Sequence, residues 1–391
     1  MARFPCESTS AVPQDLTSDC EEYDVESDPS FGDHLALLKP PDTAGHNTFE
    51  LEEIRTTPLF SMSVKHQVTK RLLDQLDPFP QYGLLAGRID SSTKQTSRST
   101  THEGGPIYRA VQDPRIFLNV GAPWSVFICG SQGSGKSHSL SCLLENCLIP
   151  SVCATQLPNP LTGLVFHYDS FTSAVGGQAC EAAYLCSSGM EVTVLVSPSN
   201  LTRMISMYQN LPGLAAGGPR VEPLLLQQRY LNVERLMTLM AISSAEGQIP
   251  LYIQVVLQIL REMAREPNLK SGIDYRDFKQ RILAKDLTPA QLGPLSLRLD
   301  LLESFIAAPI AKSKRSSKGN DWTASPGKLI IVDLSCPFVD ADTACALFDI
   351  CLGVFLEQKM DTGRVVALDE AHKVGDTVDP SPALIANTCH D

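Results

Sequence analysis

The stretch GSQGSGKS at residues 130–137 constrains the fold of this chain more than any other feature. It matches the pattern G-x-x-x-x-G-K-[ST] at every fixed position, with Gly130, Gly135, Lys136 and Ser137 in the required places. Glycines let the backbone fold closely enough for its N–H groups to surround phosphate oxygens. The stretch therefore predicts a phosphate-binding turn that opens a helix.

The residues on either side of this turn fit the same interpretation. SVFICG at 125–130 is an apolar run typical of a strand, and 137–147 continues as an amphipathic helix. Lys136 is expected to reach the outer phosphates of ATP, and the Ser137 hydroxyl is expected to ligate Mg²⁺. The predicted cofactor-binding residues are Gly130, Ser131, Gln132, Gly133, Ser134, Gly135, Lys136, Ser137 and His138.

A second motif, RVVALDEAHK at 364–373, supplies acidic residues after an apolar run. A strand here would place Asp369 at its carboxyl end, where ligands bind in parallel sheets. Asp369 is then expected to share the Mg²⁺ ion with Ser137, and Glu370 is expected to activate the attacking water as general base. The predicted reaction is hydrolysis of the β–γ bond of ATP, with Glu370 and Lys136 as catalytic residues.

Short apolar runs alternate with helical patterns from residue 113 onward. The runs are continuous, as is typical of strands buried on both faces of a parallel sheet. Besides 125–130 they occupy 163–168, 192–197, 329–335 and 364–370; the helical patterns occupy 137–147, 199–209 and 341–358, and 222–310 reads as a helical insertion. We expect an α/β fold with a mainly parallel sheet.

Charge is distributed unevenly along the 391 residues. Residues 1–60 hold 13 acidic and 3 basic side chains, whereas the remainder holds 31 and 29. We predict a disordered acidic leader over 1–60, a partly ordered segment over 61–112 and the core over 113–391. The nearly balanced charge of residues 61–391 does not exclude a nucleic-acid partner, but these residues offer no broad basic surface for one either.

Cysteine usage and apolar run length bear on location. The 12 cysteines include no Cys-x-x-Cys pair and mostly sit in apolar runs, which favours buried free thiols in a reducing compartment. The first residues lack the apolar stretch of a signal peptide. The longest uncharged apolar-rich run, 250–260, is too short to span a bilayer. We expect an intracellular protein, cytoplasmic or nuclear, that is neither secreted nor membrane-bound.

Over about residues 120–375 the chain resembles the HerA/FtsK-type group of DNA-pumping P-loop ATPases. Four stretches carry the resemblance: GSQGSGKS, VERLMTLMAISSAEGQIPLYIQVVLQILREM, KLIIVDLS followed by a helix ending LGVFLEQ, and VVALDEAHK. The resemblance implies a RecA-like core of the additional-strand catalytic-glutamate type. It also implies ATP as the nucleotide and assembly into a homo-oligomeric ring around DNA.

Two other interpretations stay open beside this one. The first is a regulatory or scaffold protein that binds nucleotide with little hydrolysis. The second is a DEAH-type helicase, because residues 369–372 spell that box; the 233 positions between Lys136 and Asp369 are wider than we expect of those helicases. A guanine-reading N-K-x-D motif does not occur, although GTP is not excluded by this.

The end of the sequence lacks one element that the resemblance implies. In the core that the chain resembles, another strand with a polar sensor follows the acidic motif, but residues 374–391 offer no Val/Ile run for it. We therefore expect a truncated or partner-completed ATPase with weak hydrolysis.

Several further residues have plain structural interpretations. Asp169 and Asp333 are expected to cap turns at strand ends, His372 to be structural, and 312–319 to be a solvated loop.

Overall fold

The computed structural model describes ten stretches of the chain, and the structural statements below concern these alone. They are residues 52–71, 77–88, 113–151, 153–169, 178–214, 218–239, 251–265, 273–307, 319–359 and 361–371. The chain divides into two compact units, residues 1–53 and 54–391, and every element below belongs to the second. Residues 1–51 of the expected acidic leader lie outside the described residues.

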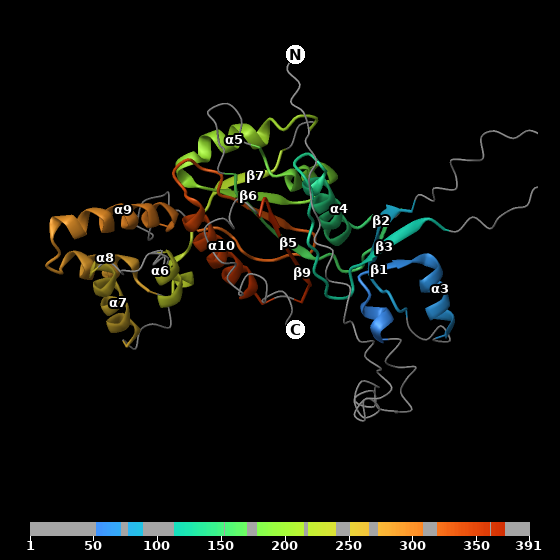
Figure 1. Ribbon diagram of the computed structural model, residues 1–391, viewed down its shortest axis with the longest axis horizontal. Helices are drawn as coiled ribbons and strands as arrows, with labels where there is room; N and C mark the ends of the chain where they lie inside the picture. Colours follow the sequence, from blue (N-terminus) through green and yellow to red (C-terminus); the bar gives the residue numbers. More distant parts are fainter. Residues whose placement is uncertain are drawn as a thin grey trace, which may run out of the picture. The chain divides into compact units, whose positions relative to one another are not determined.

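A five-stranded sheet of parallel strands forms the centre of the second unit (Figure 1). Its strands, in the order β7-β6-β8-β5-β9, are β7 (Arg220–Pro223), β6 (Val192–Val196), β8 (Leu329–Asp333), β5 (Thr162–His167) and β9 (Arg364–Asp369). All but β7 coincide with apolar runs that predict strands. The parallel sheet with its helices confirms the expected α/β class, and it brings the carboxyl ends of β8, β5 and β9 together.

Both faces of this sheet are covered, which explains why its strands are continuous apolar runs. Every residue of β5 and of β8 is buried. On β5, Leu164 and Phe166 belong to one apolar core and Val165 belongs to another. Side chains alternate between the faces along a strand, so the two cores lie on opposite sides of the sheet.

Three helices on the two faces lie close to the patterns at 137–147, 199–209 and 341–358, whereas the 3₁₀ helix at 181–188 was not predicted. One face packs against α4 (Lys136–Leu148), η3 (Glu181–Ser188) and α5 (Leu201–Gln209), which follows the short turn η4 (Pro198–Asn200). The other packs against α10 (Ala341–Leu356). The Phe348 ring of α10 lies 4.7 Å from the ring of Phe166, so this helix closes directly over β5.

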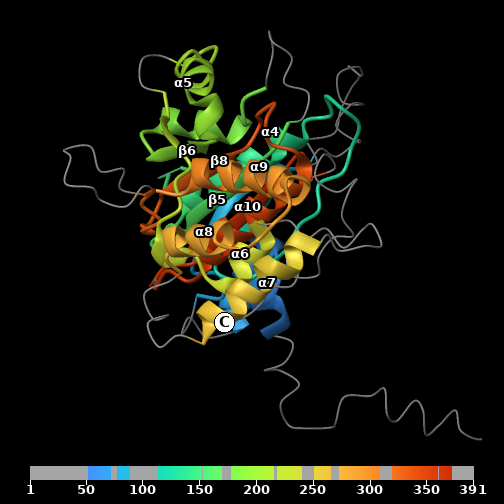
Figure 2. The ribbon, with the colours of Figure 1, turned by 90° about the vertical axis from the view of Figure 1, so that its left-hand side faces the viewer.

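The residues expected to form a helical insertion contain a cluster of helices beside α10 (Figures 1 and 2). They are α6 (Val233–Leu239), α7 (Leu251–Ala264), α8 (Tyr275–Leu283) and α9 (Pro289–Phe305), with the short turn η5 (Gln228–Tyr230) before them. Their buried side chains join the α10 core. Arg235 Nη2 donates to Glu357 Oε1 at 2.6 Å, which ties α6 to the end of α10.

A second, antiparallel sheet is built from three strands before the glycine-rich turn and one short strand after it. Its order is β1-β3-β2-β4, and its elements are β1 (Leu59–Ser61), β2 (Tyr82–Gly87), β3 (Arg115–Asn119) and β4 (Thr155–Gln156), with α3 (Met62–Arg71) after β1. Phe60 stacks on Phe79 with ring centroids 3.8 Å apart, and both are buried with Phe117. The expected boundary after residue 60 therefore falls inside β1. Strand β3, at the start of the expected core, pairs with β1 and β2 from before it.

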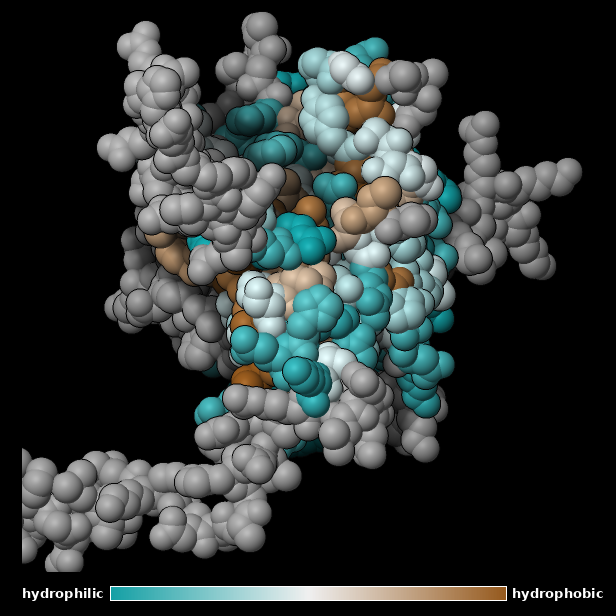
Figure 3. All heavy atoms as spheres, turned by 90° about the vertical axis from the view of Figure 1, so that its right-hand side faces the viewer, coloured by the Kyte–Doolittle hydropathy of each residue, from teal (hydrophilic) through white to brown (hydrophobic). Residues whose placement is uncertain are grey.

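Figure 3 views the unit from the side that carries this small sheet. Among the coloured residues of this face, hydrophobic side chains form separate spots between hydrophilic ones. The aromatic side chains of the sheet are turned inward instead, as the burial of Phe60, Phe79 and Phe117 requires. The small sheet thus packs its aromatic side chains into a core of its own.

The segment expected to be the strand before the glycine-rich turn is not a strand, and this prediction was wrong. Residues 123–131 are coil, with neither helix nor strand assigned. The side chains of Val126 and Phe127 are 56% and 85% exposed. A strand needs a neighbouring backbone that shares its hydrogen bonds. Within the described stretches, no strand pairs with this segment.

Strand β9 is an outer strand of the sheet. Within the part of the chain that the structure describes, β9 pairs with β5 alone. The expectation of a missing strand was based on residues 374–391, which lie outside the described residues. The unpaired side of β9 and the coil at 123–131 are therefore the two places near the motifs where sheet hydrogen bonding is incomplete among described residues.

The described cysteines are all free, but burial differs among those expected to be buried. Cys147 and Cys351 are buried, whereas Cys129 is exposed and Cys142 and Cys345 are intermediate. The exposure of Cys129 follows from the coil that carries it. Among the described helices, none combines the length and the apolar character that crossing a bilayer requires.

Candidate functional site

The glycine-rich turn, residues 130–137, is exposed over most of its length and leads directly into α4. Gly133 and Gly135 have φ angles of 77° and 87°, a left-handed conformation that glycine adopts without steric penalty. The first N–H groups of any helix lack partners within the helix, and the helix dipole adds partial positive charge there. The turn and the start of α4 are therefore chemically suited to an anion.

Two predicted metal ligands meet at the start of α4. The Ser137 hydroxyl donates a hydrogen bond to Asp369 Oδ1 at 3.1 Å, although 232 positions separate the two residues. Ser137 lies in the first turn of α4, and Asp369 is the last residue of β9. The sheet topology thus joins the glycine-rich turn to the acidic motif.

Strand register places three ionisable side chains in one row at the carboxyl edge of the sheet. His167, the last residue of β5, is paired with Asp333 of β8 on one side and with Asp369 of β9 on the other. Paired residues of parallel strands point to the same face. All three are nearly inaccessible to water, at 0% to 8% exposure.

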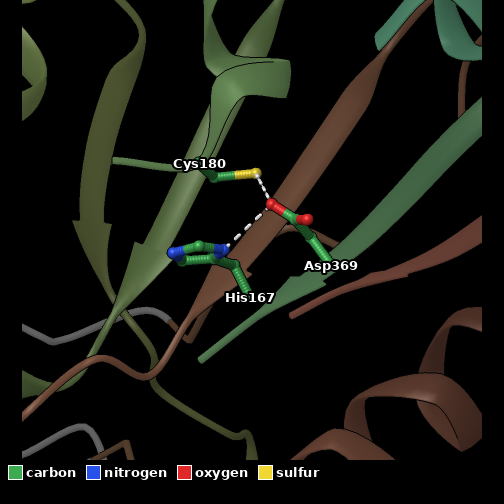
Figure 4. A group of neighbouring side chains, drawn as sticks. All are labelled: His167, Cys180 and Asp369. Atoms are coloured by element: carbon green, nitrogen blue, oxygen red, sulfur yellow. Dashed lines mark hydrogen bonds and ion pairs between the residues drawn. The ribbon is translucent and has the colours of Figure 1, made fainter. Parts of the chain in front are cut away.

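His167 is held through both ring nitrogens. Nδ1 lies 3.2 Å from Asp369 Oδ2, as Figure 4 shows, and Nε2 lies 3.2 Å from the carbonyl oxygen of Gln178. A carbonyl oxygen only accepts hydrogen bonds, so Nε2 carries a proton. An ionised carboxylate also only accepts, so Nδ1 carries one too, and the ring is an imidazolium.

The electrostatics of this row agree with its hydrogen bonds. Burial opposes a charged imidazole, but the Asp333 carboxylate and the hydrogen bond and charge of Asp369 outweigh it and raise the pKa of His167 to about 9. Burial would raise the pKa of Asp369, but His167, Ser137 and the Glu370 N–H together lower it. His167 and Asp369 therefore form a buried ion pair.

Asp333 organises a second group of buried polar side chains. Its Oδ1 accepts from the backbone N–H of Ser335 at 2.9 Å, which confirms the expected turn cap. Its Oδ2 accepts from the Tyr208 hydroxyl of α5 at 2.6 Å. Burial and the nearby Asp333 charge raise the pKa of Tyr208 well above its usual value, so the hydroxyl keeps its proton.

Glu370 follows Asp369 in an unusual backbone conformation. Its φ of 57° is the only positive value among the described non-glycine residues. Such conformations are held in place by the surrounding structure, and they cluster at functional sites. The Glu370 N–H donates to Asp369 Oδ1 at 3.1 Å, so the same carboxylate that contacts Ser137 also fixes this turn.

Two sets of side chains have the chemistry of metal ligands. Ser137 and Asp369 offer the hard oxygen atoms that Mg²⁺ prefers. His167, Cys180 and Asp369 offer nitrogen, sulfur and oxygen atoms that all lie within 4.8 Å of one another. Burial, and next the charge of Asp369, raise the pKa of the Cys180 thiol well above its ordinary value. The second set is therefore a hydrogen-bonded cluster in which His167 and Cys180 keep their protons and Asp369 is ionised (Figure 4).

The remaining predicted residues lie along the turn or outside the described stretches. Lys136 Nζ donates to the carbonyl oxygen of Ser131 at 3.1 Å, so its side chain folds back over the turn. His138 Nδ1 lies 3.2 Å from Glu181 Oε1 on the surface. Asp169 is buried, and its backbone N–H donates to Ser335 Oγ. His372 and residues 312–318 lie outside the described residues.

Sequence reasoning missed His167, Cys180 and Tyr208 as parts of this site. His167 closes an apolar run, where a polar residue at a strand end near Asp169 was a usable signal. Cys180 and Tyr208 carry no such signal, because nothing in the sequence around them indicates that they fold next to Asp369 and Asp333.

Comparisons with protein-family models, with curated proteins and with solved structures found no match.

Proposed function

We propose that the chain is an ATP-binding P-loop protein with a RecA-like core, and that it acts as a Mg²⁺-dependent ATPase related to the HerA/FtsK-type DNA-translocating motors. The 3.1 Å contact between Ser137 Oγ and Asp369 Oδ1 carries this proposal. A hydroxyl and a carboxylate meet there, beside a glycine-rich turn at a helix start. Both would hold the Mg²⁺ ion, which would supply positive charge to the phosphates of ATP.

The geometry of the turn supports phosphate as the ligand. The start of α4 offers backbone N–H groups and the positive end of the helix dipole, and α4 has no acidic residue in its first turn. Lys136 Nζ donates to the neutral carbonyl oxygen of Ser131. Exchange of that carbonyl for phosphate oxygens would give Lys136 the role of charge neutraliser.

Glu370 is the proposed general base. It follows the metal-binding Asp369 directly, and its φ of 57° turns the chain away from the line of β9. In this role the Glu370 carboxylate accepts a proton from the water that attacks the γ-phosphate. Ring assembly and DNA as partner are the further parts of the proposal, and both are supported by the sequence resemblance alone.

A second candidate function is a nucleotide-binding scaffold with little hydrolysis. It is favoured by the coil at 123–131 and by the outer position of β9, because both leave the supports of the site incompletely paired among the described residues. Catalysis of phosphoryl transfer relies on exact positioning of charged groups. A site with a loosely held turn would bind nucleotide and turn it over slowly.

Calorimetric titration with ATP and Mg²⁺ tests the binding step. Lys136→Ala is expected to weaken ATP binding at least about tenfold, or about 1.4 kcal/mol, because it removes the positive side chain that would contact the phosphates. Lys359→Ala, at an exposed lysine beyond α10, is the matched control and is expected to bind as the parent does. Equal affinity of parent and Lys136→Ala would refute the proposed site.

ATP turnover with and without single- and double-stranded DNA separates the candidate functions. Stimulation by DNA supports the motor. Binding of ATP without turnover, with or without DNA, supports the scaffold. Strand separation coupled to turnover would instead support the DEAH-type helicase that residues 369–372 also spell.

A further inference from the structure

The two oxygens of the Asp369 carboxylate contact different groups. Oδ1 accepts from the Ser137 hydroxyl and from the Glu370 N–H, both at 3.1 Å. Oδ2 lies 3.2 Å from His167 Nδ1 and 4.0 Å from the Cys180 sulfur (Figure 4). Oδ1 thus faces Ser137, the other proposed metal ligand, and Oδ2 is hydrogen-bonded to His167.

His167 is itself fixed in a way that makes it a rigid support. Its Nε2 donates to the Gln178 carbonyl, so the ring is pinned at the side opposite Asp369. Its backbone lies in β5, between two paired strands, and its side chain is 3% exposed. Ligands of metal ions commonly need such outer partners to hold their orientation.

We propose that His167 is a positioning residue of the nucleotide site, which holds Asp369 Oδ2 so that Oδ1 faces Ser137 and the Mg²⁺ ion. This inference rests on the proposed function. It deepens that function by assigning a role to a residue that contacts neither nucleotide nor metal. The carboxylate group of Asp369 can rotate about its last bond, and the hydrogen bond from Nδ1 restrains this rotation.

The chain offers a matched pair of variants for this role. His167→Asn keeps an N–H donor on the δ atom, the same distance along the side chain as Nδ1. His167→Leu has nearly the same size and shape as the asparagine variant but no donor. Any difference between the two variants therefore reports the hydrogen bond to Asp369 rather than the volume of the side chain.

The experiment measures ATP affinity of the full chain over a range of Mg²⁺ concentrations and once with EDTA. His167→Leu is expected to raise the Mg²⁺ concentration for half-maximal ATP binding about 10- to 100-fold. Its ATP affinity in EDTA is expected to equal that of the parent. His167→Asn is expected to recover most of the lost Mg²⁺ response. If circular dichroism shows His167→Leu to be unfolded, His167→Gln replaces it, because its donor sits one bond further out, toward the Gln178 carbonyl.

The outcomes separate this inference from the proposed function. An unchanged Mg²⁺ requirement in His167→Leu overturns the positioning role while the ATP site stands. Equal loss of ATP binding in both variants, with and without Mg²⁺, shows that His167 serves the fold alone and also overturns it. A parent chain that binds no ATP refutes the proposed function, and the positioning role with it.

Discussion

Two histidine–carboxylate pairs lie at the start of α4, with the same separation and opposite surroundings. His138 and Glu181 lie on the surface, with side chains 74% and 39% exposed. His167 and Asp369 lie beneath the same helix end, with side chains 3% and 9% exposed. The nitrogen and oxygen atoms are 3.2 Å apart in both pairs. Distance alone therefore says little about what such a pair contributes.

Water explains the difference between the two pairs. Solvent and salt screen an exposed pair, which contributes about 0–1 kcal/mol to stability. A buried pair has lost its hydration, so each charge depends on its partner and on hydrogen bonds from the protein. In the buried pair Asp369 accepts hydrogen bonds from the Ser137 hydroxyl and the Glu370 N–H, and His167 donates one to the Gln178 carbonyl. The pair lies within the proposed site.

Asp369→Ala breaks the buried pair and has the largest expected effect. The free energy of unfolding, measured with urea in EDTA, is expected to fall by about 3–5 kcal/mol because the imidazolium of His167 stays buried without this partner. Asp361→Ala, at an exposed aspartate just before β9, is the control and is expected to change little. A loss below about 1 kcal/mol would place the buried pair in the same class as the exposed one.

Glu370→Gln tests whether the carboxylate next to the buried pair acts in chemistry rather than in stability. The amide keeps the shape and cannot accept the proton of water, so ATP turnover is expected to drop at least about 100-fold. ATP affinity is expected to stay at the level of the parent. Glu181→Gln, at the exposed pair, is the matched control. Turnover that survives the change at 370 would show that another residue activates the water.

Tyr208→Phe tests the hydrogen bonds around Asp333, the buried carboxylate on the other side of His167. It removes the hydroxyl that donates to Asp333 at 2.6 Å and accepts from the Cys180 N–H at 3.1 Å. Leaving these buried groups without that partner is expected to destabilise the fold by about 1–3 kcal/mol in urea unfolding. Tyr184→Phe, at a half-buried tyrosine of η3, serves as the control. Equal stability of the two variants would contradict the assigned network.

Glu181→Ala tests the exposed pair and has the smallest expected effect. The free energy of unfolding is expected to change by less than about 0.5 kcal/mol at low salt, because water already screens the pair. In about 1 M salt the difference from the parent is expected to vanish, since the screening length falls to about 3 Å. A larger, salt-independent loss would show that His138 and Glu181 act as a buried pair does.

Most of the parallel strands around the site could be predicted from the order of the amino acids. The runs at 163–168, 192–197, 329–335 and 364–370 all became strands of one sheet. Burial on both faces demands apolar side chains at successive positions, so this environment is recorded in composition. The glycine pattern at 130–137 likewise predicted the turn and the helix after it, because left-handed backbone positions favour glycine.

Whether an apolar run forms a strand depends on its neighbours in the folded chain. The run at 125–130 is as apolar as β5, yet it is coil, and Phe127 is 85% exposed. Strand formation requires a partner backbone, and a run of side chains carries no record of whether one is present. The short strand β7 and the small antiparallel sheet were missed for the same reason, since pairing rather than composition makes them strands.

The site divides in the same way. The contact between Ser137 and Asp369 was expected, since both residues belong to motifs whose chemistry requires a shared ion. The place of His167 between Asp333 and Asp369 depends on strand order and register, which bring together residues about 166 and 202 positions apart. A shift of one residue in register would turn these side chains to opposite faces, so the buried row exists only in the folded sheet.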